Sequence, residues 1–554
     1  MFDYIIIGGG SAGCTLAGRL SEDPNVTVAL LEAGPPDTNI LIRVPAGLAL
    51  LAKTHQANWC LQTVPQPGLN GRRGYQPRGK VLGGSSSINA MVYIRGHAAD
   101  YDRWAAQGNP GWSYQDVLPY FKRAEHNERG ADAWHGVGGP LNVKDLTSPN
   151  RFGGLFVQAG VQAGQKANPD FNGAQQEGVG MYQVTHKDGE RFSAAKAYLT
   201  PHLARANLQV FTGALTTRIL LEKKRAVGVE FQHEGQLKQL RAAREVLLCA
   251  GGLMSPQILM LSGIGAHDHL VESGIATLHD LPGVGQNLQD HPNVVINIRA
   301  PKARDLMGIS PSGLVDAING IFEWRRHRTG MLTSNIAEAG GFIKSAPDEP
   351  RPDLQLHFVV GNLVDHGRKT ILGHGFSCHV CVLRPRSRGS VRLASKNPAE
   401  APLVDPNFLA DRDDMDRIIR GFRIMRDILT QPALAGYGNK EFATSAKAQT
   451  DMQIEQFIRD HADTEYHPVG TCRMGNGPDA VVDAQLRVHG LQGLRVVDAS
   501  IMPDLISGNT NAPVIMIAEK AADMIKAAAS ATPATSQVDV PATQAAHADT
   551  MQPA

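Results

Sequence analysis

Six residues near the amino terminus have types and a spacing that suit phosphate binding: Gly8-Gly9-Gly10-Ser11-Ala12-Gly13 fits the pattern G-x-G-x-x-G. In that pattern the first glycine allows a tight turn, the second lets backbone amides approach a pyrophosphate, and the third permits close packing of a helix on a strand. The start of the helix adds partial positive charge for the phosphates. The pattern predicts a bound dinucleotide, with FAD and NAD both open and a ligand-free glycine turn as the alternative.

This fingerprint needs a strand before it and a helix after it. Residues 4–7 are apolar, residues 11–20 are mostly small with helical spacing, and residues 26–31 form a second apolar run. These runs predict a βαβ unit. Glu32, at the end of the second strand, can accept hydrogen bonds from ribose hydroxyls. The sequence has no second G-x-G-x-x-G, which disfavours a reductase that binds two nucleotides.

The composition is that of a large globular protein with balanced charge. The chain has 554 residues, of which 42% are hydrophobic and 19% charged, and its length suits roughly three or four units of about 150 residues. Lys plus Arg total 54 and Asp plus Glu 53, a formal net charge of +1. Such a balance argues against a nucleic-acid partner.

The six cysteines are too few for a disulfide scaffold and suit a reducing compartment. Cys378 and Cys381 flank His379 like half of a zinc or redox site. They lie in the strand-like run 376–383, however, where residues three apart point to opposite faces. No second cluster completes a tetrahedral set of ligands, so we expect no metal.

The sequence favours a cytoplasmic location. No cationic segment precedes the first apolar run, and no run approaches the ~20 apolar residues that cross a bilayer. Two segments leave peripheral contact with the inner face of the cell membrane open. Residues 40–52 are rich in leucine, and residues 324–328 are basic, although core packing and a solvated helix face are the simpler interpretations.

Two longer segments carry a family resemblance. Residues 79–89 read GKVLGGSSSIN, and residues 251–265 read GGLMSPQILMLSGIG. Together with the fingerprint they resemble the signatures of the glucose-methanol-choline (GMC) family of FAD oxidoreductases, over about residues 2–526. Among the branches of that family, the chain is most similar to bacterial alcohol dehydrogenases that oxidise long-chain primary alcohols. At Gly252 the family usually has a slightly larger small residue, and we expect only a packing difference without consequence for the chemistry.

The resemblance implies an α/β fold with a Rossmann-like FAD-binding domain, the GMC fold, and a second, substrate-binding domain. We expect the FAD-binding domain in residues 1–300 and the substrate-binding domain in residues 301–460. Residues 461–526 return to the FAD-binding domain with the catalytic residues. Residues 527–554, rich in Ala, Thr and Pro and free of Lys and Arg, are predicted to be disordered.

The pattern of residues 301–460 predicts a mostly antiparallel sheet backed by helices. Strand-like runs lie at residues 354–360, 376–383 and 390–393, and residues 415–429 have helical spacing. A closing helix is predicted at residues 513–526.

The resemblance also implies where the cofactor binds, with the first signature beside the isoalloxazine ring and backbone at residues 89–92 holding the flavin. Ile88 stands where some choline-oxidising relatives have a histidine bonded to the flavin. Isoleucine cannot form that bond, so we predict non-covalent FAD. The expected cofactor contacts are Gly8, Gly10, Ser11, Ala12, Gly13, Glu32, Ala33, Gly83, Ser87, Asn89, Ala90, Met91, Val92, Thr216, Ala250, Asp498, Ala499, Asn509, Thr510 and Asn511.

Two late segments resemble the catalytic segments of the family. Residues 466–475 contain His467, and residues 507–513 contain Asn509 and Asn511. The resemblance makes His467 the base and Asn509 the residue that holds the substrate hydroxyl, with the roles of Asn509 and Asn511 open to exchange. A neutral imidazole suits removal of a hydroxyl proton near neutral pH, with a pKa of about 6.5 if unshifted.

The implied reaction is oxidation of a primary, aliphatic alcohol to an aldehyde by hydride transfer to flavin N5, with a quinone or another non-nicotinamide acceptor. Alternatives within the family are an oxidase that uses oxygen and a dehydrogenase of choline, polyethylene glycol or furan alcohols. A flavin-dependent lyase or a binding module without turnover is more remote. Glu465, two residues before His467, would favour polar or cationic alcohols if it faced the cavity.

Overall fold

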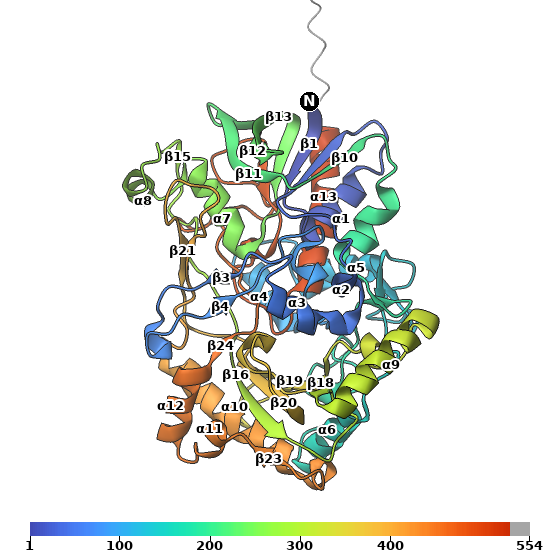
Figure 1. Ribbon diagram of the computed structural model, residues 1–554. Coiled ribbons are helices and arrows are strands. Elements are labelled where there is room, and N and C mark those ends of the chain that lie inside the picture. The colour runs from blue at the N-terminus through green and yellow to red at the C-terminus, as the bar shows by residue number, and fades with distance from the viewer. Residues whose placement is uncertain (532–554) are drawn as a thin grey trace, which may run out of the picture.

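The βαβ unit predicted at the amino terminus lies at the centre of a seven-stranded sheet (Figure 1). In the computed structural model, which describes residues 1–531, strand β1 (Phe2–Ile7) leads into helix α1 (Ser11–Leu20). Strand β2 (Val28–Glu32) returns parallel to β1. The predicted strand, helix and acid are therefore all present, and Glu32 is the last residue of β2.

The rest of this sheet comes from distant parts of the chain. Strand β13 (Gln236–Leu248) is long, because its second half pairs parallel with β1 and its first half pairs antiparallel with β12. The strand order is β10-β2-β1-β13-β12-β11, and β25 pairs with β13. The additional strands are β10 (Leu208–Thr212), β11 (Leu215–Glu222), β12 (Arg225–His233) and β25 (Leu494–Val496).

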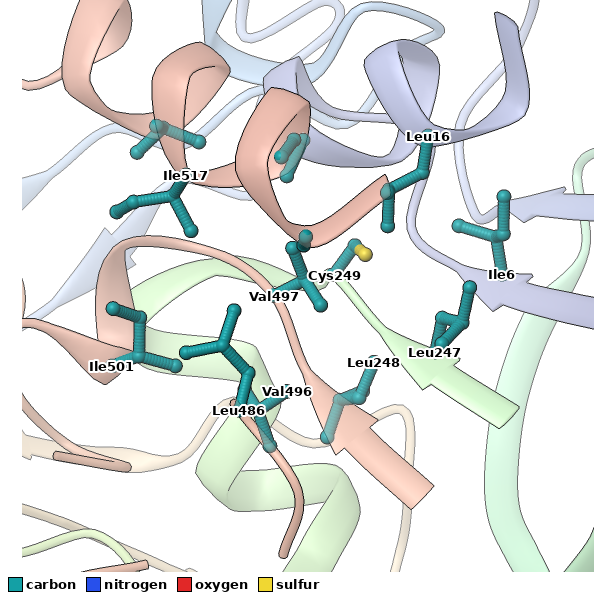
Figure 2. Close-up of a cluster of buried hydrophobic side chains, with 14 of the residues drawn as sticks. Ile6, Leu16, Leu247, Leu248, Cys249, Leu486, Val496, Val497, Ile501 and Ile517 are labelled. Atoms are coloured by element: carbon teal, nitrogen blue, oxygen red, sulfur yellow. The ribbon is translucent and has the colours of Figure 1, made fainter. Parts of the chain in front are cut away.

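Helices α1 and α13 (Asn511–Ala531) pack together against the first sheet. Figure 2 shows part of this core, in which Leu16 of α1 and Ile517 of α13 belong to the same buried cluster as Ile6 and Leu247 of the sheet. Helix α13 extends beyond its predicted end. The prediction of disorder from residue 527 is therefore wrong for residues 527–531, where alanines of high helix propensity continue the helix. The remainder of the predicted tail lies outside the described residues.

A second, eight-stranded sheet is antiparallel at every pairing, as predicted. Its strand order is β23-β16-β20-β19-β18-β7, with β17 beside β20 and β24 beside β16. Helices α6 (Arg151–Gln162) and α10 (Arg412–Thr430) cover one face with a separate hydrophobic core. The strands are β7 (Gly178–Met181), β16 (Pro292–Arg299), β17 (Gly308–Ile309), β18 (Ala337–Ile343), β19 (Leu354–Val359), β20 (Gly373–Val382), β23 (Lys440–Glu441) and β24 (Asp463–Thr464).

Three of these strands come from outside residues 301–460. Strands β7 and β16 belong to the segment expected to bind FAD, and β24 belongs to the returning segment. The second sheet therefore draws its strands from several separated parts of the chain, and the domain limits stay a prediction.

Two details of the sequence analysis concern individual strands. Cys378 and Cys381 of β20 lie in different hydrophobic clusters, so their side chains face opposite sides of the sheet as expected. The run 390–393, in contrast, does not join the second sheet. Among the strands of residues 1–531, β21 (Ser390–Arg392) pairs with β22 (Leu403–Asp405) alone, and Val391 packs in a small separate cluster against helix α7 (Gly251–Leu261). Within residues 1–531, every helix is too short or too polar to cross a bilayer.

Candidate active site

A cavity of about 710 Å³ is lined by residues of both sheets and of the loops between them. The fingerprint and the first signature contribute one part of its wall, and β19, β20 and the two late segments contribute another. All the predicted cofactor contacts line this cavity except Gly13, Gly83 and Ser87. Most of the predicted contacts therefore lie in the wall of one cavity.

The three glycines of the fingerprint differ in their surroundings. A side chain at Gly8 would lie 2.6 Å from the carbonyl oxygen of Cys249, and one at Gly13 would lie 1.9 Å from that of Gly8. A side chain at Gly10, in contrast, would meet no atom within 4 Å, and Gly10 lines the cavity. Gly8 and Gly13 are thus required by packing, while Gly10 leaves the backbone open to a ligand, as a pyrophosphate site requires.

Glu32 both lines the cavity and holds the fingerprint loop. Its two carboxylate oxygens accept hydrogen bonds from the backbone amides of Gly9 at 2.9 Å and Gly34 at 2.7 Å. Burial raises the pKa of this carboxyl to about 7 in spite of those bonds. Each oxygen keeps a further lone pair, so the residue fits a role as acceptor from ribose hydroxyls.

Gly83 and Ser87 do not line the cavity, and the structure gives the reason. The Gly83 amide donates to the carbonyl of Gly9 at 2.7 Å, and the Ser87 hydroxyl donates to the carbonyl of Leu82 at 2.7 Å. These hydrogen bonds hold the first signature in place against the fingerprint loop. That these two residues and Gly13 contact the cofactor stays a prediction.

The two late segments bring His467 and Asn509 together. The amide Nδ2 of Asn509 lies 3.3 Å from Nε2 of His467, and both residues line the cavity. Asn511 instead accepts a hydrogen bond from the Ser11 hydroxyl at 2.7 Å, beside the fingerprint. Of the two asparagines left open by the sequence, Asn509 is therefore the neighbour of His467.

Backbone contacts hold His467 in place. The preceding residue, Tyr466, has φ +72°, a left-handed conformation that costs a bulky residue about 1–3 kcal/mol. Arg78 stabilises it by donating to the Tyr466 carbonyl at 2.7 Å, while the His467 amide donates to a carboxylate oxygen of Asp290 at 2.9 Å. This combination fixes the direction in which the imidazole leaves the backbone.

The tautomer of His467 follows from its neighbour His291. Nε2 of His291 lies 3.0 Å from the carbonyl oxygen of Leu383 and 3.2 Å from that of Ile506, so it must carry a proton. Burial lowers the pKa of His291 to about 4, so its Nδ1 is an unprotonated acceptor at neutral pH. That atom lies 3.0 Å from Nδ1 of His467. His467 therefore carries its proton on Nδ1, and its Nε2 is an unprotonated acceptor.

The orientation of the Asn509 amide is fixed in a similar way. Gln355 donates from Nε2 to the Asn509 oxygen at 3.0 Å and to the Tyr182 hydroxyl at 3.3 Å. The Tyr182 hydroxyl in turn donates to the Leu356 carbonyl at 2.6 Å. Because the chain of donors runs in one direction, Asn509 presents its NH₂ group to Nε2 of His467.

The amino-acid sequence matches a family model described as GMC oxidoreductase at residues 2–293, and a second model with the same description at residues 385–518. The chain belongs to the GMC oxidoreductase family. The family resemblance inferred from the signatures is confirmed.

Similar proteins cover nearly the whole chain. An alcohol dehydrogenase (acceptor) of Pseudomonas putida is 50% identical over 528 residues, 95% of this chain and 96% of the relative. Mitochondrial choline dehydrogenase of Homo sapiens is 46% identical over 534 residues, 95% of this chain and 90% of the relative. The solved structure of an FAD-dependent oxidoreductase from Chaetomium thermophilum has a TM-score of 0.88 at 29% identity and covers 96% of this chain and 100% of that one. This GMC oxidoreductase therefore uses FAD.

The second GMC signature packs against the segment that carries His467. Gly252 packs so tightly that a side chain there would lie 2.4 Å from the carbonyl oxygen of Pro468, the residue after His467. The Thr471 hydroxyl also donates to the Gly252 carbonyl at 2.6 Å. The small residue at this position thus bears directly on where the histidine segment lies.

Sequence reasoning missed several polar residues of the site, among them His291, Asp290 and Gln355. One signal was available. Residues 354–358 alternate apolar and polar types, with Gln355 and His357 between buried Leu354, Leu356 and Phe358. In a strand covered on both faces, such alternation indicates that one face meets a polar site.

Proposed function

We propose that this GMC oxidoreductase oxidises primary, aliphatic alcohols to aldehydes, with His467 as the base and Asn509 as the residue that holds the hydroxyl. One observation carries the proposal: the lone pair on His467 Nε2 and the NH₂ group of Asn509 face each other across 3.3 Å. A substrate hydroxyl beside them can donate to the first and accept from the second. Bound FAD supplies the acceptor for the hydride that leaves the carbinol carbon.

The surroundings of His467 favour its role as a proton acceptor. Burial, followed by the adjacent imidazole of His291, holds its pKa well below the usual value of 6.5, so the ring is neutral at physiological pH. Removing the hydroxyl proton as the hydride departs avoids a protonated aldehyde, and general base catalysis of this kind contributes about 10²–10⁴-fold. Asn509 contributes by fixing the geometry of the hydroxyl.

The remaining wall of the cavity supports an aliphatic substrate. Apolar side chains from α3 (Leu48–Thr54), from the segment around β17 and from the loops near residues 331 and 363 line it. They are Leu48, Leu51, Met307, Ile309, Met331, Leu332, Leu363 and Ile371. A choline-type alcohol is the second candidate, favoured by the carboxylate of Glu465 in the same cavity.

We propose a quinone or another non-nicotinamide acceptor for the electrons. The single dinucleotide fingerprint in the sequence supports this, because a nicotinamide acceptor would need a second binding site. Oxygen is the rival acceptor. The yield of hydrogen peroxide per alcohol oxidised in air distinguishes them: a low yield supports the dehydrogenase, and a stoichiometric yield makes the protein an oxidase.

Peripheral membrane contact is proposed at helix α9 (Pro311–His327), at the edge of the molecule in Figure 1. Gly313 and Ala317 on its inner face line the cavity, whereas a neighbouring stripe of large apolar side chains is exposed. Arg325 and Arg326 extend the exposed surface with positive charge. The stripe consists of Leu314, Val315, Ile318, Ile321 and Phe322, which are 47–64% exposed.

This arrangement suits a surface that rests on anionic lipid near the entrance for an apolar alcohol. Residues 324–328 are not exposed throughout, because Trp324 is buried and donates to the Gly189 carbonyl at 2.8 Å. Sedimentation with anionic vesicles tests the contact. Ile318→Asp is expected to abolish vesicle binding and to leave oxidation of a water-soluble alcohol unchanged. Equal vesicle binding by Ile318→Asp and the wild type would contradict the proposed membrane contact.

Anaerobic mixing of the flavin-loaded enzyme with 1-octanol tests the proposed reaction. We expect the yellow flavin absorbance to bleach and octanal to appear in equal amount. A flavin that stays oxidised with every alcohol tried would make the protein a lyase or a binding module.

A further inference from the structure

Three ionisable side chains without a role in the proposed reaction lie in the cavity wall near His467. They are Glu465, His357 and His379, which are only 7%, 4% and 4% exposed and all line the cavity. Such groups are rarely buried unless they are paired or functional. The cluster therefore calls for a physical explanation.

The second sheet brings the three groups together. His357 on β19 and His379 on β20 are direct partners across the antiparallel pair, so their side chains share one face. Glu465 directly follows β24, and its amide donates to the His291 carbonyl at 2.9 Å. Its carboxylate reaches both histidines, with Oε1 3.3 Å from Nδ1 of His357 and Oε2 3.5 Å from Nδ1 of His379.

These contacts leave the cluster short of hydrogen bonds. Oε2 of Glu465 and both ring nitrogens of His357 and His379 lack a hydrogen-bond partner of acceptable geometry within residues 1–531. In contrast, His467, two residues after Glu465, and its neighbour His291 have partners for both ring nitrogens. A buried polar group without a partner costs about 1–3 kcal/mol, so the difference points to a group that completes the cluster from the cavity.

The charge of the cluster indicates what that group is. Burial raises the pKa of Glu465, but the imidazoles of His357 and His379, whose Nδ1 atoms face its carboxylate, lower it below the usual range, so the carboxylate is ionised. Burial lowers the pKa of His357, so that ring is neutral at physiological pH. A neutral imidazole has one N–H and one acceptor nitrogen. With the N–H of His357 on Nδ1, toward Glu465, its Nε2 and the carboxylate oxygens are left as acceptors, and the matching ligand is a donor.

We infer that Glu465, His357 and His379 form a subsite for a second, hydrogen-bond-donating group of the substrate, a hydroxyl or a protonated amine close to the carbinol carbon. The inference rests on the proposed function, because it takes the reacting hydroxyl to lie at His467 and Asn509. Glu465 and His467 are two residues apart in the chain and line the same cavity, so the second donor group lies close to the reacting hydroxyl. The enzyme then prefers alkane-1,2-diols or 2-amino-1-alkanols to plain 1-alkanols.

Two other ligands fit less well. Residues 1–531 contain no group of three or more His, Cys, Asp or Glu arranged to hold a metal ion. A quaternary ammonium such as choline carries positive charge but has no N–H to donate, so it leaves the acceptors of the cluster unpaired.

Rates of anaerobic flavin reduction test the inference with 1-octanol, 1,2-octanediol, 2-amino-1-octanol and choline. We expect the wild-type enzyme to give a kcat/KM at least tenfold higher for the diol or the amino alcohol than for 1-octanol. Glu465→Leu should remove that preference while 1-octanol is still oxidised. Glu465→Gln separates the two donors, since it should spare a preference for the neutral diol and abolish one for the cationic amine.

Glu338→Gln is the matched control. It alters a buried carboxyl of the same sheet that is bonded to Ser334 and does not line the cavity, and the substrate ratios should not change. Three outcomes would overturn the subsite. The first is the same kcat/KM for 1-octanol, the diol and the amino alcohol, and the second is a higher kcat/KM for choline than for the diol and the amino alcohol. The third is an equal loss of kcat/KM for all substrates in Glu465→Gln. Each of these outcomes keeps the proposed alcohol oxidation intact, whereas failure of every alcohol to bleach the flavin refutes both.

Discussion

Nδ1 of His467 and Nδ1 of His291 lie 3.0 Å apart, and only one of the two can carry the proton between them. Two carbonyl oxygens hold the other nitrogen of His291 in its protonated form. The proton between the rings therefore belongs to His467, and its Nε2 is left as the acceptor that faces Asn509. The carbonyl oxygens around His291 thus determine which ring nitrogen of His467 can accept a proton.

His291 is expected to act as a positioning residue for the base. His291→Phe removes the acceptor for Nδ1–H of His467 and frees the ring to adopt the wrong tautomer, so kcat for flavin reduction should fall by roughly 10²-fold. His291→Asn keeps an acceptor for His467 and a donor for the Leu383 carbonyl, and should recover most of that loss. Equal rates in the two variants would show that His291 only fills space.

His467→Ala removes the base itself. We expect the variant to bind flavin normally, because the predicted cofactor contacts lie in other segments, and to reduce it about 10²–10⁴-fold more slowly than wild type with 1-octanol. Stopped-flow absorbance under nitrogen measures the rate. Normal anaerobic reduction in this variant would remove the assignment of His467.

Local sequence patterns predicted the parts of this protein that depend on neighbouring residues. The βαβ unit, the glycine fingerprint and the strands β19 and β20 are of this kind, since alternation, turn glycines and helical spacing act over a few residues. The contact of His291 with His467 joins residues 176 positions apart. Strands β7 and β16 also enter the second sheet through long-range pairings, such as Gly178 with Phe342 and Asn293 with Cys381. Local sequence patterns do not predict such partners, because tertiary packing determines which residues meet.

The pH profile of flavin reduction should reflect the lowered pKa of His467. Protonation of the base stops the reaction, and burial and His291 hold its pKa below 6.5. The rate should therefore stay constant from pH 9 down through 6.5 and fall only at more acid pH. The negative charge of Glu465 raises the His467 pKa, so Glu465→Gln should move the acid limb to still lower pH. A shift to higher pH would contradict this electrostatic account.

We expect the flavin to leave the denatured protein without cleavage of a covalent bond. Ile88 lines the cavity at the position where some relatives carry a linking histidine, and its side chain offers no nucleophilic atom. Acid precipitation should leave the yellow colour in the supernatant, and the intact protein should have the mass of its polypeptide alone. A protein heavier by one flavin would require another attachment point on the chain.

Gly252→Ala should lower activity by displacing the segment that carries His467. The added methyl group would lie 2.4 Å from the carbonyl oxygen of Pro468, which must move and take His467 with it. Displacement of a catalytic group by a fraction of an ångström to 1 Å can cost about 10²-fold in rate. Gly154→Ala in helix α6 is the matched control, because no atom lies within 4 Å of the added group. The control should keep full activity and gain about 0.5–1 kcal/mol of stability. If Gly252→Ala reduces its flavin as fast as this control, the tight packing of the second signature has no bearing on the position of the base.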